Sequence, residues 1–255
     1  GRDRSQGNID TCKNRQAAEE GMRAVFFSDA HLRGADDEGC GLLLSFLREA
    51  ARNLDHLFIV GDLFDFWFSK GGVVYPGFQP VIDKLAALQG SGVQVHLFEG
   101  NHDFWLADYF TRHHGIEVFT DEVLLQLDGK QIYIAHGDLV DETDRGYRLL
   151  RSVLRSRLFF GLQRLLPLPL LWRFARLSSD ASKEYLAKPQ EGLAAKMEAF
   201  ALKKFDEGID AVILGHCHLP AIRTHSVGDR QGQFVLLGDW LHPRSYLVMD
   251  SGGFD

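Results

Sequence analysis

Short apolar runs that stop at glycine or at a polar residue recur along the chain. Five of them are four to six residues long and rich in β-branched and aromatic side chains, which predicts strands, some buried on both faces. They cover residues 23–27, 56–60, 93–98, 131–135 and 211–214. Asp, His or Asn follows each run within a few residues, so we expect these polar side chains in loops at strand ends.

Other segments predict helices, a hairpin and two further strands. The helices are expected over residues 37–53, 80–89 and 104–114. Asp128-Gly129-Lys130 lies between apolar runs at 123–127 and 131–134 and predicts a β-hairpin turn. Two further strands are expected over residues 234–237 and 246–249, at the far edge of the β-structure.

A different pattern fills residues 144–204, where leucines and arginines alternate with helical spacing. The apolar positions include Leu149, Leu150, Val153 and Leu154, and the basic ones between them are Arg148, Arg151 and Arg155. Pro167 and Pro169 predict two or more short helices instead of one continuous helix. Between residues 144 and 188 there are ten Lys or Arg against three Asp or Glu, although the whole chain has a net charge of -7.

Such a basic, apolar segment has three interpretations: a lid over a lipid chain, an element that rests on anionic headgroups, or a helical subdomain with its own core. Burial of apolar area stabilises by about 25 cal/mol per Å², so an exposed patch of Leu and Phe predicts a partner. The arginines would attract a diphosphate or an anionic membrane surface. We therefore favour a lid or a membrane-facing element.

The composition limits the classes of protein to which the chain can belong. The chain has 255 residues, 45% of them hydrophobic, which suits one domain with a substantial core plus an insertion, while residues 1–21 are polar and predict a flexible tail. Three cysteines without C-x-x-C spacing predict neither a disulfide framework nor a zinc ribbon. The negative net charge disfavours a general nucleic-acid binder, and no nucleic-acid partner is expected. No stretch approaches the roughly 20 apolar residues that span a bilayer, so we expect a cytoplasmic protein.

The polar clusters after the strands form five motifs that carry the candidate chemistry. They are Ser28-Asp29-Ala30-His31, Gly61-Asp62, Gly100-Asn101-His102-Asp103, His136-Gly137-Asp138 and Gly215-His216-Cys217-His218. Two metals about 3.5 to 4 Å apart can bind phosphoryl oxygens, activate a water and hold it in line for attack. Mixed imidazole and carboxylate ligands suit Mn(II), Fe(II) or Zn(II) better than Mg(II) or Ca(II). The motifs therefore predict metal-assisted hydrolysis of a phosphate ester.

In this order the motifs resemble the calcineurin-like metallophosphoesterase family, whose pattern is D-x-H, G-D-x-x-D, G-N-H-D/E, H-G-D and G-H-x-H. The resemblance covers about residues 23–245. It implies that one metal is bound by Asp29, His31, Asp62 and His218. It implies that the other is bound by Asp62, Asn101, His136 and His216, so that Asp62 bridges the pair.

The same resemblance assigns the catalytic residues. His102 is expected to contact the phosphate and to help the leaving oxygen depart, and Asp103 is expected to orient His102. Asp65 and Asp138 are expected to accept hydrogen bonds behind the ligands, although either could equally be a capping or turn residue.

The insertion between the H-G-D and G-H-x-H motifs is similar to the helical lid of the UDP-2,3-diacylglucosamine diphosphatases of lipid A biosynthesis. Residues 61–67 resemble their G-D-L-F-E-x-W block. This likeness implies a manganese enzyme that hydrolyses UDP-2,3-diacylglucosamine, or another lipidic diphosphate, to UMP and 2,3-diacylglucosamine 1-phosphate. It implies substrate contacts from Asn101, His102, Asp144, Arg148, Ser182, Lys183 and His216. Many members carry Arg at the position of His102, so the exact substrate does not follow from this likeness.

The expected fold is an α/β four-layer αββα sandwich of two mixed sheets over residues 22–255, with a helical lid at 144–204. Two other functions stay open. A soluble metallophosphodiesterase or nuclease of the same superfamily would need a basic groove. A non-catalytic metal-binding scaffold would use its surface for protein binding, but the complete ligand set argues against it. A lid that rests on lipid headgroups would place the protein on the cytoplasmic face of the inner membrane.

Overall fold

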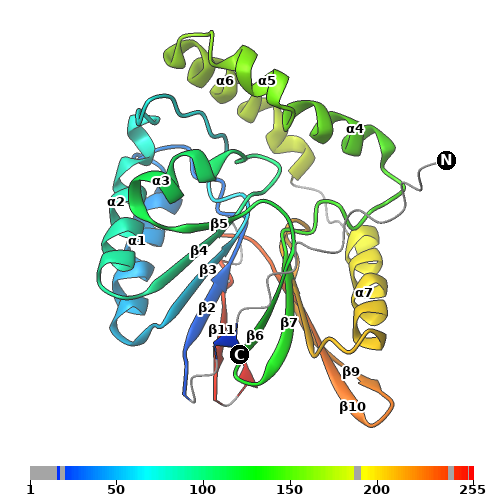
Figure 1. Cartoon of the computed structure of the whole chain (residues 1–255). Coiled ribbons are helices and arrows are strands. Elements are labelled where there is room, and N and C mark those ends of the chain that lie inside the picture. Colours follow the sequence, from blue (N-terminus) through cyan, green and yellow to red (C-terminus); the bar gives the residue numbers. More distant parts are fainter. Residues whose placement is uncertain (1–15, 18–20, 187–190, 241–243, 252) are drawn as a thin grey trace, which may run out of the picture.

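The computed structural model describes residues 16–17, 21–186, 191–240, 244–251 and 253–255. Two six-stranded sheets face each other, and helices cover their outer faces (Figure 1). Both sheets contain parallel and antiparallel pairs, which confirms the predicted αββα sandwich. Among the described residues, no helix is long and apolar enough to cross a membrane.

The first sheet has a parallel centre. Its parallel strands are β2 (Ala24–Phe27), β3 (His56–Val60), β4 (Gln94–Phe98) and β5 (Glu117–Phe119), and β11 (Leu247–Asp250) and β12 (Gly253–Phe254) extend it antiparallel beyond β2. Phe27, Leu57 and Ile59 pack toward the outer helices, whereas Phe26, Phe58 and Val60 face the second sheet. Burial on both faces explains why these strands are continuous apolar runs.

The second sheet has the strand order β1-β6-β7-β8-β10-β9. These strands are β1 (Gln16–Ala17), β6 (Val123–Leu127), β7 (Lys130–Ala135), β8 (Ala211–Leu214), β9 (Pro220–Val227) and β10 (Arg230–Leu237). The predicted hairpin is confirmed, because Asp128 and Gly129, with φ of 48° and 73°, join β6 to β7. The predicted far edge is wrong. β10 and β11 lie in different sheets, and neither is an edge strand, because β9 lies beyond β10 and β12 lies beyond β11.

Three helices and three short 3-10 turns lie on the side of the first sheet. They are α1 (Glu38–Ala50), α2 (Gln79–Gly90) and α3 (Phe110–His114), with turns at Ala51–Asn53, Pro76–Phe78 and Leu106–Asp108. Asp37 caps α1 by accepting a hydrogen bond from the Gly39 N–H at 3.1 Å. The helices predicted at 37–53 and 80–89 are confirmed. The helix predicted at 104–114 starts later and is divided: Trp105, with a left-handed φ of 66°, precedes the 3-10 turn, and Tyr109 separates that turn from α3.

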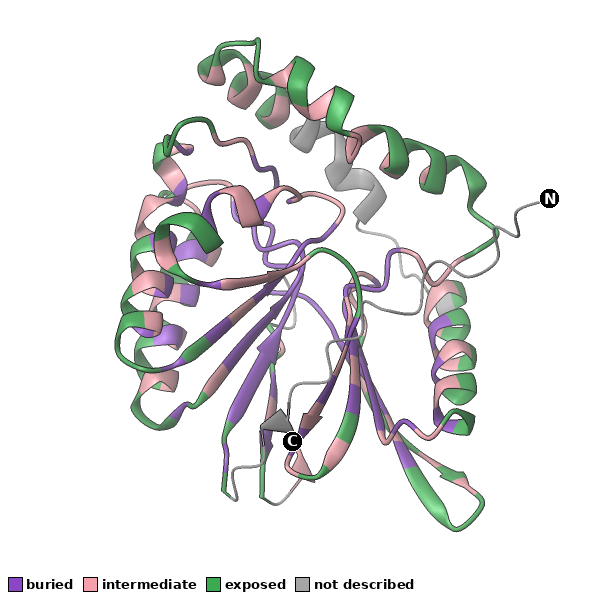
Figure 2. Ribbon diagram, viewed as in Figure 1, coloured by how far each residue is buried: buried purple, intermediate pink, exposed green. Residues whose placement is uncertain are grey.

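The lid consists of three helices that lie across one end of the sandwich (Figure 1): α4 (Arg145–Leu154), α5 (Arg157–Gln163) and α6 (Leu168–Leu186). They are largely exposed where their side chains are described (Figure 2). Separate helices were predicted from Pro167 and Pro169, and the structure confirms them.

The helix α7 (Glu191–Asp206) belongs to the sandwich and not to the lid. Its Met197, Ala201 and Phe205 are buried in one cluster with Val212 and Phe234 of the second sheet. The predicted lid boundary at residue 204 is therefore corrected, and the lid ends with α6. The mistake arose because charge and helical spacing continue through α7, although Pro189 and Gly192 give a sequence signal for a boundary between the two elements.

Candidate active site

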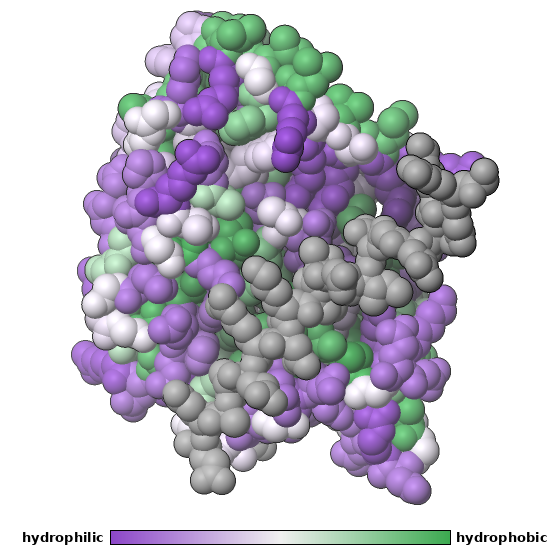
Figure 3. Space-filling view, in the orientation of Figure 1, coloured by the Kyte–Doolittle hydropathy of each residue, from purple (hydrophilic) through white to green (hydrophobic). Residues whose placement is uncertain are grey.

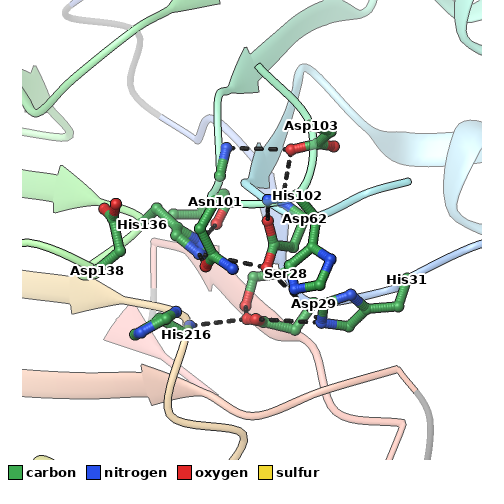
Figure 4. A network of polar contacts seen from close by, with 12 residues as sticks. Ser28, Asp29, His31, Asp62, Asn101, His102, Asp103, His136, Asp138 and His216 are labelled. Carbon is green, nitrogen blue, oxygen red and sulfur yellow. Dashed lines mark hydrogen bonds and ion pairs between the residues drawn. The ribbon is translucent and has the colours of Figure 1, made fainter. Parts of the chain in front are cut away.

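All seven predicted metal ligands lie in loops after β2, β3, β4, β7 and β8, and the structure brings them into one pocket (Figure 4). Asp62 lies at its centre, with Oδ2 3.7 Å from His31 Nε2 and 3.5 Å from His136 Nε2. On one side, Asp29 Oδ1 is 3.7 Å from His218 Nε2. On the other side, Asn101 Oδ1 is 3.0 Å from His136 Nε2. The two ligand sets predicted from the sequence therefore lie on either side of Asp62, and their binding of metal stays a prediction.

The donor atoms suit metal cations. Asp29, His31 and His218 form one group whose ligand atoms lie within 4.8 Å of one another, and Asp62, His136 and His216 form another. Asp29 Oδ1 and both ring nitrogens of His31 are buried and accept or donate no hydrogen bond within the described structure. Buried polar atoms almost always have a partner, so these atoms fit the role of metal ligands.

Five of the seven ligands have a strained backbone. Asp29, His31, Asp62, His216 and His218 have φ values of 54°, 44°, 52°, 67° and 56°. Non-glycine residues seldom adopt such angles, which persist where the surrounding structure imposes them, often at functional sites. Here the Asp29 N–H donates to the Gly61 carbonyl oxygen at 3.1 Å, and the His31 N–H donates to that of Asp62 at 2.9 Å. The loops after β2 and β3 thus hold each other in place.

Two glycines make room for the ligands. A Cβ atom on Gly61 would lie 2.4 Å from His136 Nδ1, and one on Gly100 would lie 2.0 Å from Asp62 Oδ1. Gly61 also has a φ of 85°. The glycines of the G-D and G-N-H-D motifs are therefore required by close packing against the bridging carboxylate and a ligand imidazole.

The pocket shifts the pKa values of its imidazoles in opposite directions. Burial lowers the pKa of His31, and burial together with the neighbouring His136 lowers that of His216 to about 4. Burial also acts on His136, but the Asp62, Asp29 and Asp138 carboxylates outweigh it and raise its pKa to about 9. Binding of a divalent cation beside Asp62 would therefore release a proton from His136.

Acceptors behind the ligands fix the ring orientations. His136 Nδ1 is 2.9 Å from the Val60 carbonyl oxygen, and His218 Nδ1 is 3.3 Å from Asp239 Oδ2. Asp65 Oδ1 lies 3.8 Å from His31 Nδ1, in the position expected for an outer acceptor. Asp239 was not predicted. It could have been found, because it directly follows an apolar run and a glycine, as the other site residues do.

The predicted role of Asp103 in orienting His102 is wrong. The Asp103 carboxylate accepts hydrogen bonds from the backbone N–H groups of Asp62, Gly100 and Phe64 at 3.0, 3.1 and 3.0 Å. It therefore joins the two loops that carry Asp62 and Asn101. Burial and the nearby Asp62 carboxylate raise the pKa of Asp103 well above its usual range.

His102 lies at the mouth of the same pocket. Its backbone N–H donates to Asp62 Oδ1 at 2.9 Å, and its Nδ1 is 3.2 Å from the Asp65 carbonyl oxygen. The ring meets that of His31 edge-to-face, with centroids 4.8 Å apart. The His102 side chain is 21% exposed, in contrast to 2% for His31, so a substrate can reach it. Its catalytic role stays a prediction.

The remaining predicted substrate contacts lie around the lid. Asp144 caps α4, accepting from the Tyr147 N–H at 2.8 Å, and Arg148 donates to the Leu139 carbonyl oxygen at 3.2 Å. Arg148 also lines a cavity of about 520 Å³ under α4. Ser182 and Lys183 belong to α6, but their side chains lie outside the described residues. All four contacts stay predictions.

Cys217 lies between His216 and His218 but does not face the pocket. It is buried among the apolar residues under α7, and burial raises the pKa of its thiol to about 11. The residue therefore packs in the core.

Comparison with known proteins agrees with this geometry. The model of the calcineurin-like phosphoesterase family matches residues 22–220. The UDP-2,3-diacylglucosamine hydrolase of Stenotrophomonas maltophilia (strain K279a) is 34% identical, covering 91% of this chain and 97% of the relative. The enzyme of the same name from Aeromonas salmonicida (strain A449) is 30% identical, covering 91% of each chain. The solved structure of an archaeal phosphodiesterase is 15% identical. The match covers 92% of this chain and 98% of that protein, but the TM-score is only 0.43. On the strength of the sequence matches, the chain belongs to the calcineurin-like phosphoesterase family.

Proposed function

We propose that this chain is a dinuclear-metal hydrolase that cleaves the diphosphate bond of UDP-2,3-diacylglucosamine, giving UMP and 2,3-diacylglucosamine 1-phosphate. The observation that carries the proposal is the convergence of seven donor side chains, with Asp62 at their centre, from five separate strand ends. The substrate is suggested by relatives of that name, which match the chain over about nine tenths of its length.

We propose Mn(II) as the native metal, with Fe(II) and Zn(II) compatible with the same mixture of imidazole and carboxylate ligands. Asp29, His31 and His218 would hold one ion, Asn101, His136 and His216 the other, and Asp62 both. When bound, the two ions would bind the phosphoryl oxygens and lower the pKa of a water that attacks phosphorus.

The chain's own residues would orient the substrate. Nδ1–H of His102 can donate to the Asp65 carbonyl oxygen at 3.2 Å, which leaves Nε2 for the diphosphate. A protonated Nε2 would donate a hydrogen bond to the bridging oxygen as its bond to the α-phosphorus breaks. Arg148, on the exposed rim of the cavity under α4, supplies a positive charge that can hold a phosphoryl oxygen.

The lid supports a lipidic substrate. Leu158, Leu162 and Leu165 are 74%, 54% and 79% exposed, and apolar side chains gather with basic ones over the lid (Figure 3). Exposed leucines of this number are costly without an apolar partner. We propose that the lid covers the acyl chains and rests on the anionic cytoplasmic face of the inner membrane.

The test is release of UMP from UDP-2,3-diacylglucosamine by the purified protein with Mn(II). We expect UMP from the wild type and none above background from Asp62→Asn, while Asp36→Asn, which changes an exposed carboxylate, stays active. Cleavage of a simple diester or of single-stranded DNA without UMP release would instead identify a soluble phosphodiesterase or nuclease. Absence of hydrolysis of all these substrates would identify a non-catalytic scaffold.

A further inference from the structure

The lid helix α4 presents its polar residues inward and its apolar residues to solvent. Leu149, Leu150 and Val153 are 69%, 55% and 50% exposed. Tyr147, Arg151 and Arg155 follow at intervals of four residues, so they lie on one face, and this face turns toward the metal site. The helix is therefore attached to the sandwich by hydrogen bonds and ion pairs more than by apolar packing.

Arg155 holds the loop that carries Asn101. Its Nη2 donates to the Gly100 carbonyl oxygen at 2.8 Å, and its Nη1 donates to Glu99 Oε2 and to the Thr120 carbonyl oxygen, both at 3.0 Å. Gly100 and Asn101 share a peptide bond, so this contact holds the plane of the peptide from which Asn101 extends toward His136. The guanidinium is mostly buried, with 15% of the side chain exposed, so its contacts are shielded from water.

Arg151 and Tyr147 hold the loop that carries His136. Arg151 Nε donates to Asp138 Oδ2 at 2.8 Å, and the Tyr147 hydroxyl donates to the same oxygen. Asp138 is buried and lies two residues after His136. The Tyr147 ring also lies 6.4 Å from that of His216 between centroids. The face of α4 thus reaches the neighbourhood of three of the four ligands proposed for the second metal.

The two loops belong to different sheets. Gly100 and Asn101 follow β4 of the first sheet, and His136 follows β7 of the second. Asn101 Oδ1 and His136 Nε2 are 3.0 Å apart, so a small relative movement of the sheets would change this half of the site. Because α4 is tied to both loops, it is placed to fix their separation.

We propose that Tyr147, Arg151 and Arg155 are positioning residues for the second metal half-site, formed by Asp62, Asn101, His136 and His216, so that the placement of the lid controls one of the two metals. This inference rests on the dinuclear centre of the proposed function. The proposal concerns only one of the two ions. Asp29 and His31, which belong to the other half-site, lie in the loop after β2, and none of the bonds described above joins Tyr147, Arg151 or Arg155 to that loop.

The test is a Mn(II) titration of the full chain, followed by electron paramagnetic resonance, which separates isolated Mn(II) from an exchange-coupled pair. The wild type is expected to bind two ions and to develop the coupled signal. In Arg155→Met the affinity for one ion should fall about 10- to 100-fold, as when a group that orients a ligand is removed, while the other affinity is unchanged. Added Mn(II) should restore the coupled signal. Arg145→Ala, an exposed arginine of the same helix, should behave as the wild type.

Tyr147→Phe keeps the ring and removes one hydrogen bond, so it should lower the affinity for the same ion to a smaller extent. If Arg155→Met does not fold, as judged by circular dichroism, Tyr147→Phe decides the question by the same criterion. Unchanged affinities for both ions, or an equal loss of both, would overturn the inference and leave the proposed function standing. A wild-type protein that binds fewer than two ions would overturn the proposed function itself.

Discussion

The loops that form the site and the lid that lies over them are constructed in opposite ways. Asp29, His31 and Asp62 are at most 1% exposed, although they are polar, whereas Leu158 and Leu165 of the lid are 74% and 79% exposed, although they are apolar. The ligands are held by backbone hydrogen bonds between strand-end loops. The comparison teaches that the sandwich holds the candidate ligands in place by itself, whereas the lid leaves its outer leucines uncovered, which is the reason for the proposed lipidic partner.

The sandwich can impose strained backbone angles on the ligands because its core is tightly packed. Directly beneath the site, the rings of Phe26 and Phe58 stack between the two sheets with centroids 4.6 Å apart. Strands that cannot shift leave the loops at their ends little freedom. The lid has no described residue as deeply buried, and it joins the sandwich through polar contacts and a few partly buried rings, such as Phe160 on Trp105 and Trp172 on Tyr75.

The largest expected difference between the two regions is in stability. Phe58→Ala should lower the free energy of unfolding by about 3–5 kcal/mol, because it leaves a cavity between the sheets. Phe174→Ala, in the lid, should change it by less than about 0.5 kcal/mol, since that ring is 61% exposed. Urea unfolding of both variants measures the difference. Equal losses would mean that the lid has a core of its own.

A smaller effect, on metal affinity, is expected from the residue that orients the His218 ring. Asp239→Asn removes the charge that orients His218 and should lower Mn(II) affinity about 10- to 100-fold without unfolding the protein. Asp229→Asn, which changes an exposed carboxylate in the hairpin between β9 and β10, is the matched control. Calorimetric titration with Mn(II) measures both. An unaltered affinity in Asp239→Asn would show that this contact does not support the site.

The exposed leucines of the lid, unlike the polar face of α4, should matter for lipidic substrates alone. Leu165→Ser should reduce kcat/KM for the diacylated substrate about 5- to 10-fold, as expected when one leucine loses part of its apolar contact. Hydrolysis of a water-soluble diester should be unchanged. Leu202→Ser alters a leucine on α7 that is 41% exposed and should affect neither substrate. A loss on both substrates in Leu165→Ser would assign the lid a structural role.

The smallest effect concerns acid sensitivity of the sandwich. Burial and the neighbouring His96 lower the pKa of His56 to about 4, below its ordinary value of 6.5. The unfolded chain therefore takes up a proton at this residue at a higher pH than the folded protein, so stability falls as pH drops from 6.5 toward 4. His56→Gln should lose less stability between pH 7 and pH 5 than the wild type in urea unfolding. Identical losses would contradict this assignment.

Much of the fold and of the metal site could be predicted because local patterns determine both. Doubly buried strands produce continuous apolar runs, and close packing demands glycine where each run ends beside Asp62 or His136. The β9 strand was not predicted, because it is an edge strand with mostly exposed residues and has no apolar run.

Contacts between distant loops could not be predicted in the same way. The pairing of Asp239 with His218 depends on the return of the chain after β10. The backbone contacts of Asp103 depend on how two loops pack, and its sequence position next to His102 suggested a different partner. The inward polar face of α4 was not predicted either, since Arg151 and Arg155 find their partners in loops that lie 13 and 55 residues earlier in the chain.

The most direct measurement is the amount of manganese that stays with each chain after dialysis, determined by elemental analysis for the wild type and for Asp62→Asn. A bridging Asp62 between two sets of ligands predicts two ions per wild-type chain and at most one in the variant. A wild type that retains fewer than two ions, or a variant that retains both, would contradict the dinuclear site.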